Sequence, residues 1–179
     1  EKYKNPIVVI GHDCRFGGQM FSETAAKIFA SQGVEVKLAS GFVSTPMVSL
    51  GVLKENANIG IVITASHNPP SYNGYKLKGD FGGPLLQDDI SDIENRIPDI
   101  IPFDIEGLIF NDFITRGVIS YVDLESIYCK HAEENFDLDL IKNSEINLAY
   151  DAMFGSGMNT IKNLLPNTTL LHCEQNPGF

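Results

Sequence analysis

Four side chains able to take part in chemistry lie close together in the sequence. They are the hydroxyl of Ser66, the imidazole of His67, the amide of Asn68 and the ammonium group of Lys76. A serine oxygen can carry a phosphoryl group covalently. Amide N–H groups can hold phosphate oxygens, and a lysine can offset the charge that develops during transfer. This set of groups suits phosphoryl transfer, although a solvated turn without chemistry has the same polar composition.

These residues follow a short apolar, β-branched run at Ile59–Ile63, which predicts a strand buried on both faces. Pro69-Pro70 cannot continue a β-ladder, and Asn73-Gly74 favours a tight turn. We therefore expect Ser66 to stand on a stiff loop at the end of a buried strand. Reactive groups are often held at such places.

The segments Thr64–Pro70 and Tyr72–Lys76 resemble the phosphoserine loop of the α-D-phosphohexomutases. This family contains phosphoglucomutase, phosphomannomutase and phosphoglucosamine mutase. The resemblance implies that Ser66 is phosphorylated and that its phosphate binds Mg²⁺. It also implies that His67 and Lys76 are catalytic residues that assist proton and charge handling.

A second loop, at positions 11–18, resembles the Gly-Arg-Asp-x-Arg loop of the same family. Asp13 and Arg15 keep that pattern, whereas a histidine stands at position 12. The resemblance implies that Arg15, Thr64 and Asn68 bind phosphate or substrate.

The reaction that this resemblance implies is intramolecular phosphoryl transfer between hexose 1-phosphate and hexose 6-phosphate. Phosphorylated Ser66 gives its group to the sugar phosphate, and a hexose 1,6-bisphosphate forms, which also serves as activator. A phosphate then returns to Ser66. The expected partner is a phosphosugar, and these residues leave the preferred hexose and the oligomeric state open.

The resemblance covers nearly the whole chain but only the first part of such an enzyme. We therefore expect the remaining metal ligands and the sugar-specificity loop to lie beyond Phe179. The isolated chain is expected to be inactive.

Three alternatives stay open at this point. The first is a phosphoglucosamine mutase, and the second is a noncatalytic sugar-phosphate-binding module on the same fold. The third is a serine hydrolase that uses Ser66. His67 is an awkward base for it because the two residues are adjacent, and the sequence has no Gly-x-Ser-x-Gly motif.

The charge of the chain argues against two classes of partner. The formal net charge is -10 and the pI is about 4.7, so the overall field repels nucleic-acid backbones and anionic lipid surfaces. We expect no nucleic acid and no membrane as partners. An anionic sugar phosphate would need local cations, for which Arg15, Lys76, Lys78 and a bound metal ion are the candidates.

The cellular location follows from segments that the sequence lacks. No apolar run is long enough to cross a bilayer, and Glu1–Pro6 lacks the apolar segment of a secretory signal. Three widely spaced cysteines, at positions 14, 129 and 173, suit reduced thiols. The expected location is the cytoplasm.

The order of the predicted elements gives the fold class. With 43% hydrophobic residues among 179, the chain can bury one substantial core. Strands at 7–10, 34–39 and 59–63 alternate with helices at 19–32 and 45–54, an order that favours parallel strands. Further expected elements are an edge strand at 75–78 and helices at 88–97 and 121–136.

We expect an α/β protein in which residues 1–143 form a three-layer α/β/α domain with a mixed, mostly parallel sheet. A linker at 137–144 would join it to residues 144–179. That second segment is expected to form a strand at 146–150, a helix to Leu165 and a strand at 168–173. It should be the first β-α-β unit of a second, similar domain.

Overall fold

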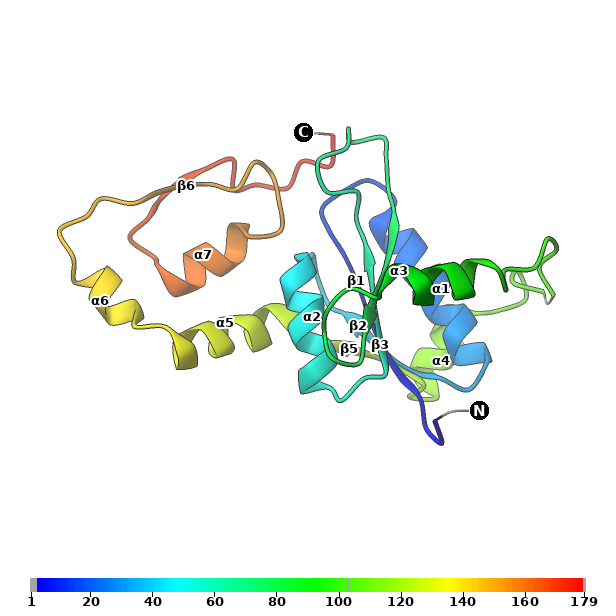
Figure 1. The fold of residues 1–179 in the computed structure, drawn as a ribbon. Helices are drawn as coiled ribbons and strands as arrows, with labels where there is room; N and C mark the ends of the chain where they lie inside the picture. Colours follow the sequence, from blue (N-terminus) through cyan, green and yellow to red (C-terminus); the bar gives the residue numbers. More distant parts are fainter. Residues whose placement is uncertain (1–2, 103, 179) are drawn as a thin grey trace.

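The computed structural model describes residues 3–102 and 104–178, which form two β-sheets with helices around them (Figure 1). The larger sheet has five strands in the order β4-β3-β1-β2-β5. Its neighbouring strands are parallel, except that β4 runs antiparallel to β3. The strands are β1 Ile7–His12, β2 Glu35–Ala39, β3 Ile59–Ile63, β4 Tyr75–Gly79 and β5 Ile119–Val122. The predicted mixed, mostly parallel sheet is confirmed.

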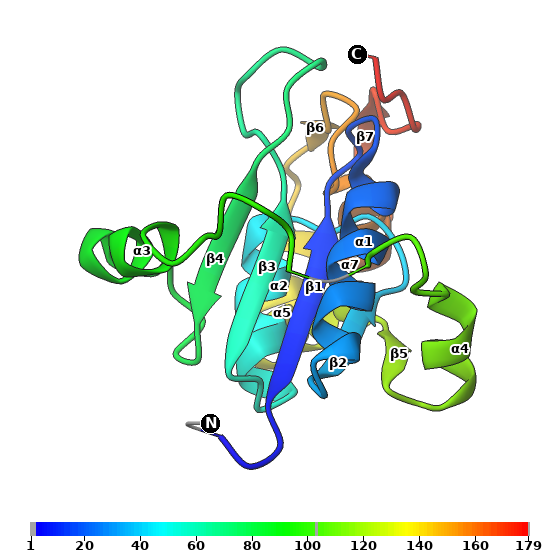
Figure 2. The ribbon, with the colours of Figure 1, turned by 90° about the vertical axis from the view of Figure 1, so that its right-hand side faces the viewer.

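Helices cover both faces of this sheet, because the central strands carry apolar side chains that point to both faces. Val8 and Ile10 of β1 pack with α1 and α4, whereas Val9 packs with α2 and with Leu124 of α5. Figure 2 shows α1 in front of the strands and α2 and α5 behind them. The helices of this part are α1 Gly18–Ser31, α2 Thr45–Lys54, α3 Gln87–Glu94, α4 Phe110–Thr115 and α5 Leu124–Asn135. The three-layer α/β/α arrangement is confirmed.

The direction in which the chain crosses the sheet reverses between β1 and β3. The connection through α1 leads from β1 to β2, and the connection through α2 returns past β1 to β3 on the other face. The loops that follow β1 and β3 therefore leave the same edge of the sheet side by side. In open α/β sheets, ligands bind at this kind of reversal, at the carboxyl ends of the strands.

The helix predicted over residues 121–136 begins later in the structure. Ile119–Val122 forms β5 instead, parallel to β2, and Ile119 is in the core with 1% of its surface exposed. Asp123 then caps α5, because its Oδ1 accepts a hydrogen bond from the backbone N–H of Ser126 at 2.9 Å. The hydroxyl and the backbone N–H of Ser126 hold the pKa of Asp123 below its ordinary value.

One smaller expectation is also corrected. The linker predicted at 137–144 contains a short helix, α6 Leu138–Lys142. Helix α2 covers the predicted range and has Ser44 at its N-cap. Helix α3 is confirmed and lies beyond the edge strand β4 without a buried residue (Figure 2).

The last segment forms its own small sheet. Strands β6 Ala149–Asp151 and β7 Thr169–Leu171 are parallel and are joined through α7 Met158–Leu164, which confirms the predicted β-α-β unit. It touches the larger part through Glu125 of α5, whose carboxylate accepts a hydrogen bond from the Thr160 hydroxyl at 2.9 Å. The domain boundary at residue 143 stays a prediction.

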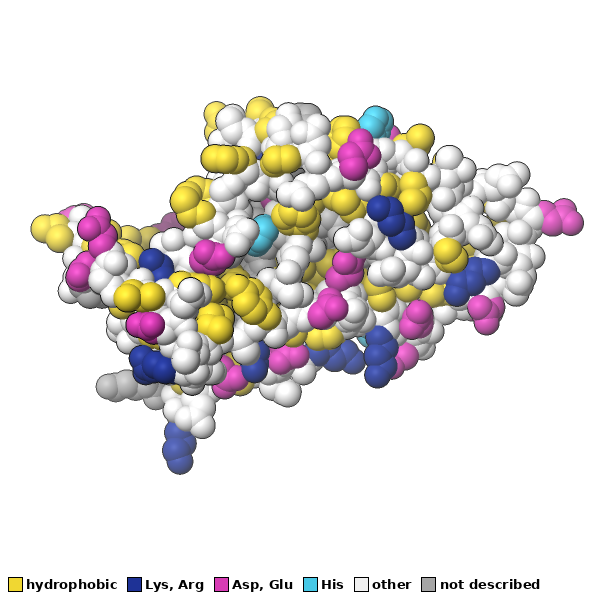
Figure 3. Space-filling model, turned by 180° about the vertical axis from the view of Figure 1, so that it is seen from behind, with side chains coloured by type: hydrophobic (Ala, Val, Ile, Leu, Met, Phe, Trp, Pro, Cys, Tyr) yellow, Lys and Arg dark blue, Asp and Glu magenta, His cyan; other side chains and the backbone are white. Residues whose placement is uncertain are grey.

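The surface bears charges of both signs. On the face that Figure 3 shows, the Lys and Arg side chains of the described residues are scattered among Asp and Glu side chains. The expected absence of a nucleic-acid partner stays a prediction.

No helix in the described part of the chain is long and apolar enough to span a membrane. The cytoplasmic location stays a prediction.

We predict that Gly60→Ala lowers the free energy of unfolding by about 1–3 kcal/mol, because it overpacks the contact between β3 and α2. A Cβ at Gly60 would lie 2.5 Å from Cγ2 of Val52 and 3.1 Å from Cβ of Lys78. Gly41→Ala is the matched control, since a Cβ there would meet no atom within 4 Å. Urea unfolding followed by circular dichroism measures both; equal stability of the two variants would contradict this account of the packing.

Candidate active site

The loop that carries Ser66 is closed at its base and bonded within itself. The backbone N–H of Thr64 donates to the carbonyl oxygen of Gly74 at 3.1 Å, directly after β3 and before β4. Inside the loop, the N–H of Asn68 donates to the carbonyl of Ala65 at 3.0 Å. These bonds confirm the expected loop at the end of the buried strand β3.

Ser66 is exposed on this loop and has a left-handed backbone with φ 52°. A positive φ is uncommon for a residue with a Cβ and marks a locally constrained backbone. Within the described residues the Ser66 hydroxyl makes no hydrogen bond. His67 and Asn68 are exposed beside it. The loop thus presents a hydroxyl, an imidazole and an amide to one open side.

A carboxylate from the loop after β1 joins the two loops. The Thr64 hydroxyl donates to Oδ2 of Asp13 at 2.6 Å and accepts the backbone N–H of Ser66 at 3.4 Å. Oδ1 of Asp13 accepts the backbone N–H of Arg15 at 3.0 Å, and Oδ2 lies 3.3 Å from Nε of Arg15. Asp13 was not among the predicted site residues. Its place in the Gly-His-Asp-x-Arg pattern could have indicated its role in the site.

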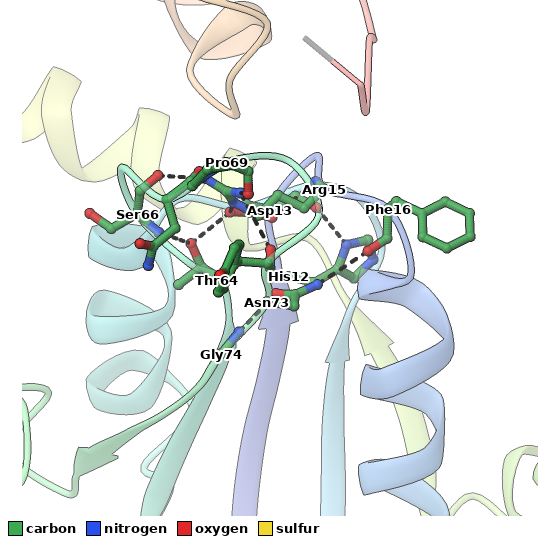
Figure 4. A network of polar contacts seen from close by, with 11 residues as sticks. His12, Asp13, Arg15, Phe16, Thr64, Ser66, Pro69, Asn73 and Gly74 are labelled. Carbon is green, nitrogen blue, oxygen red and sulfur yellow. Dashed lines mark hydrogen bonds and ion pairs between the residues drawn. The ribbon is translucent and has the colours of Figure 1, made fainter.

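The Arg15 side chain lies under the Ser66 loop and is 4% exposed (Figure 4). One terminal nitrogen, Nη1, donates to the carbonyl oxygens of Pro69 at 2.8 Å and Tyr72 at 3.4 Å. The other, Nη2, donates to those of Ser66 at 2.7 Å and Asn68 at 2.8 Å. A contact of Arg15 with phosphate stays a prediction.

The two lysines of β4 differ in environment. Lys76 is exposed and no hydrogen bond or ion pair joins it to the Ser66 loop within the described residues, whereas Lys78 is 8% exposed. Burial, and then the charge of Lys76, lower the pKa of Lys78.

The sequence predicts that Mg²⁺ binds to the phosphate of Ser66. Among residues 3–102 and 104–178, no group of three or more His, Cys, Asp or Glu side chains is arranged to hold a metal ion. Mg²⁺ prefers a set of oxygen ligands that includes carboxylates. The described residues do not by themselves fit a Mg²⁺ site, and the binding of Mg²⁺ to a Ser66 phosphate stays a prediction.

Two further residues of the first loop are structural. His12 ends β1, is 9% exposed and has its Nδ1 2.8 Å from the carbonyl oxygen of Asp13. Burial, and then the charge of Asp13, raise the pKa of the Cys14 thiol to about 11. A thiol of this kind is a poor nucleophile near neutral pH. Cys14, Cys129 and Cys173 are free thiols, as predicted.

Residues 1–102 match the family described as phosphoglucomutase/phosphomannomutase, alpha/beta/alpha domain I. The chain belongs to this family. It is 39% identical to the phosphoglucomutase of Staphylococcus saprophyticus over an alignment that covers 66% of this chain and 22% of that protein. It is 30% identical to the phosphoglucomutase of Staphylococcus haemolyticus over an alignment that covers 100% of this chain and 34% of that protein.

A solved structure supports the same relationship. A Thermus thermophilus protein assigned as a phosphomannomutase superposes with a TM-score of 0.85 at 30% identity, over 97% of this chain and 39% of that chain. The chain thus spans about a third or less of the length of the two staphylococcal relatives. The family and the fold that the sequence predicted are confirmed, whereas the roles of the individual site residues stay predictions.

We predict that Thr64→Val lowers the free energy of unfolding by about 1–3 kcal/mol, because it removes a donor from the partly buried carboxylate of Asp13. Thr115→Val is the matched control: its hydroxyl donates only to the exposed carbonyl of Asn111, so a change within about 0.5 kcal/mol is expected. Chemical unfolding measures both variants. A Thr64→Val protein as stable as the control would show that the hydroxyl does not hold the loops together.

Proposed function

We propose that this chain carries the phosphoserine of a phosphohexomutase, which interconverts a hexose 1-phosphate and a hexose 6-phosphate. The observation that supports this most is the exposed Ser66 hydroxyl on a loop whose backbone is tied to the loop after β1. Membership of the phosphoglucomutase/phosphomannomutase family supports the same class of reaction. Glucose and mannose are both candidate hexoses, because relatives of both names match the chain.

In the proposed cycle, phosphorylated Ser66 gives its phosphoryl group to a hydroxyl of the hexose phosphate. The P–O bond to Ser66 Oγ breaks, and this exposed oxygen takes up a proton from solvent as it leaves. A P–O bond to the sugar oxygen forms, and the hydroxyl proton passes to a base, for which we propose His67. The hexose 1,6-bisphosphate turns over and returns its other phosphate to Ser66. A loose transition state of this kind depends mainly on in-line positioning and charge stabilisation.

The other residues would act around the phosphoryl group. The exposed amide of Asn68 can donate to a phosphate oxygen, and the exposed ammonium of Lys76 can offset charge in the transition state. The Thr64 hydroxyl already donates to Asp13, so we give Thr64 a role in holding the loop. Mg²⁺, when bound to the phosphate, would supply further charge stabilisation.

Inactivity of the isolated 179-residue chain stays a prediction. Phosphoglucosamine mutase activity and noncatalytic sugar-phosphate binding are outcomes that the following experiments can distinguish from the proposal.

We predict that Ser66 carries phosphate in the active enzyme and that Ser66→Ala lowers turnover to about one thousandth or less, as expected for loss of a covalent nucleophile. Peptide mass spectrometry of the purified enzyme and a coupled assay with glucose 1-phosphate, mannose 1-phosphate and glucosamine 1-phosphate measure this. Ser71→Ala, at another exposed serine of the same loop, is the control and should keep full activity. An unphosphorylated Ser66 in active enzyme, together with an active Ser66→Ala variant, would refute the proposal.

We predict that Lys76→Met lowers turnover by about 10- to 1,000-fold, the usual span for loss of one charge-stabilising donor. The melting temperature should barely change, because an exposed lysine has little packing to lose. Lys54→Met is the matched control, since Lys54 is an exposed lysine at the end of α2, before β3, and thus at the opposite end of the sheet. Normal turnover with a large loss of melting temperature would make Lys76 structural.

A further inference from the structure

We propose that Arg15 is a positioning residue that holds the backbone of the Ser66 loop, and that it does not bind phosphate. Its effect on catalysis rests on the function proposed above, whereas its effect on the loop can be measured independently.

The first argument is the number of donors. A guanidinium group has five N–H bonds in a planar fork. Nε faces Oδ2 of Asp13, and the two terminal nitrogens donate to the carbonyl oxygens of Ser66, Asn68, Pro69 and Tyr72. These five acceptors lie around the whole fork of the guanidinium group. A phosphate oxygen would have to displace one of these carbonyl groups.

The second argument concerns charge. The Arg15 side chain is 4% exposed, and the carboxylate of Asp13 lies 3.3 Å from its Nε. A buried cation is stable only when it is paired and hydrogen-bonded, and both conditions are met here. The positive charge of Arg15 is thus balanced within the protein, which makes it a weak attractor for an anionic substrate. Exposed Lys76 is the better candidate for that task.

The third argument concerns Ser66 itself. The shortest of the four carbonyl contacts, at 2.7 Å, is the one to the carbonyl oxygen of Ser66. The N–H of Ser66 points to the Thr64 hydroxyl at 3.4 Å, and that hydroxyl is fixed by Asp13. The two backbone groups of a residue with φ 52° are thus both directed by the loop after β1. This arrangement orients the Ser66 hydroxyl, and phosphoryl transfer is sensitive to such orientation.

The loop contact is tested by hydrogen exchange on the 179-residue chain. Arg15→Lys retains the charge but not the fork, so backbone amides from Ala65 to Gly74 should exchange at least about tenfold faster, while those of β1 and α2 stay unchanged. Arg96→Lys is the control, because Arg96 pairs with Asp92 on the exposed face of α3. Unchanged exchange in the loop, or faster exchange across the whole chain, would overturn the proposal.

The effect on catalysis is tested by kinetics on the active enzyme. For a positioning residue, Arg15→Lys should lower kcat by about 10- to 100-fold with KM for the sugar phosphate within about twofold. A roughly tenfold higher KM with unchanged kcat would mean that Arg15 binds the substrate phosphate, which would overturn the proposal. Should the wild-type enzyme show no mutase activity, the proposed function fails, and the hydrogen-exchange result still decides whether Arg15 holds the loop.

Chemical rescue separates positioning from a general loss of stability. Arg15→Ala leaves space for a free guanidinium ion, so millimolar guanidinium chloride should restore both loop protection and turnover, whereas the same concentration of ammonium chloride should not. Arg96→Ala is the control and should not respond to either salt. Failure of guanidinium to restore loop protection in a folded Arg15→Ala protein would show that the five-acceptor arrangement does not govern the loop.

Discussion

The parallel pairing of β1 with β3 is the constraint on which the site depends. The two strands are paired from Val8 opposite Ile59 to His12 opposite Ile63, and the N–H of Asp13 continues the ladder with a bond to the carbonyl of Ile63 at 3.2 Å. Both strands therefore end at the same level. Because apolar side chains of these two strands point to both faces of the sheet, helices must cover both faces. Polar groups of a site are then carried by the loops at the strand ends. Asp13 and Thr64 meet at that point for this reason.

The positively charged side chains near the site fall into two groups: those buried within the protein and those exposed to solvent. Arg15 is neutralised by Asp13, and Lys78 is buried with a lowered pKa, so neither offers a freely hydrated positive charge. Lys76 is exposed on the strand that follows the Ser66 loop. In a chain with net charge -10, an anionic substrate meets an unfavourable overall field. Recognition of a phosphosugar would therefore depend on short-range donors such as Lys76 and Asn68.

The sequence predicted the parts of this structure that depend on local pattern. The apolar runs of β1 and β3, the helices α1 and α2 and the loop around Ser66 were all recognisable without a structure. Strand β5 was not, because Ile119–Val122 has only Ile119 buried and is defined by its pairing with β2. The contacts of Arg15 were equally hidden, since its acceptors are backbone carbonyl groups more than fifty positions away, and a carbonyl group has no signature in the sequence.

Three consecutive residues after β1 connect three loops. Asp13 accepts a hydrogen bond from the Thr64 hydroxyl, Arg15 donates to the backbone around Ser66, and the Cys14 thiol between them lies beside Ser156, in the loop between β6 and α7. The first loop is therefore in contact both with the loop that holds Ser66 and with the small β-α-β unit. Its own position is fixed by the pairing of β1 with β3, so the sheet sets the distance between these loops. A fixed distance of this kind would suit the proposed phosphoryl transfer, in which the phosphate donor must stay in line with its acceptor.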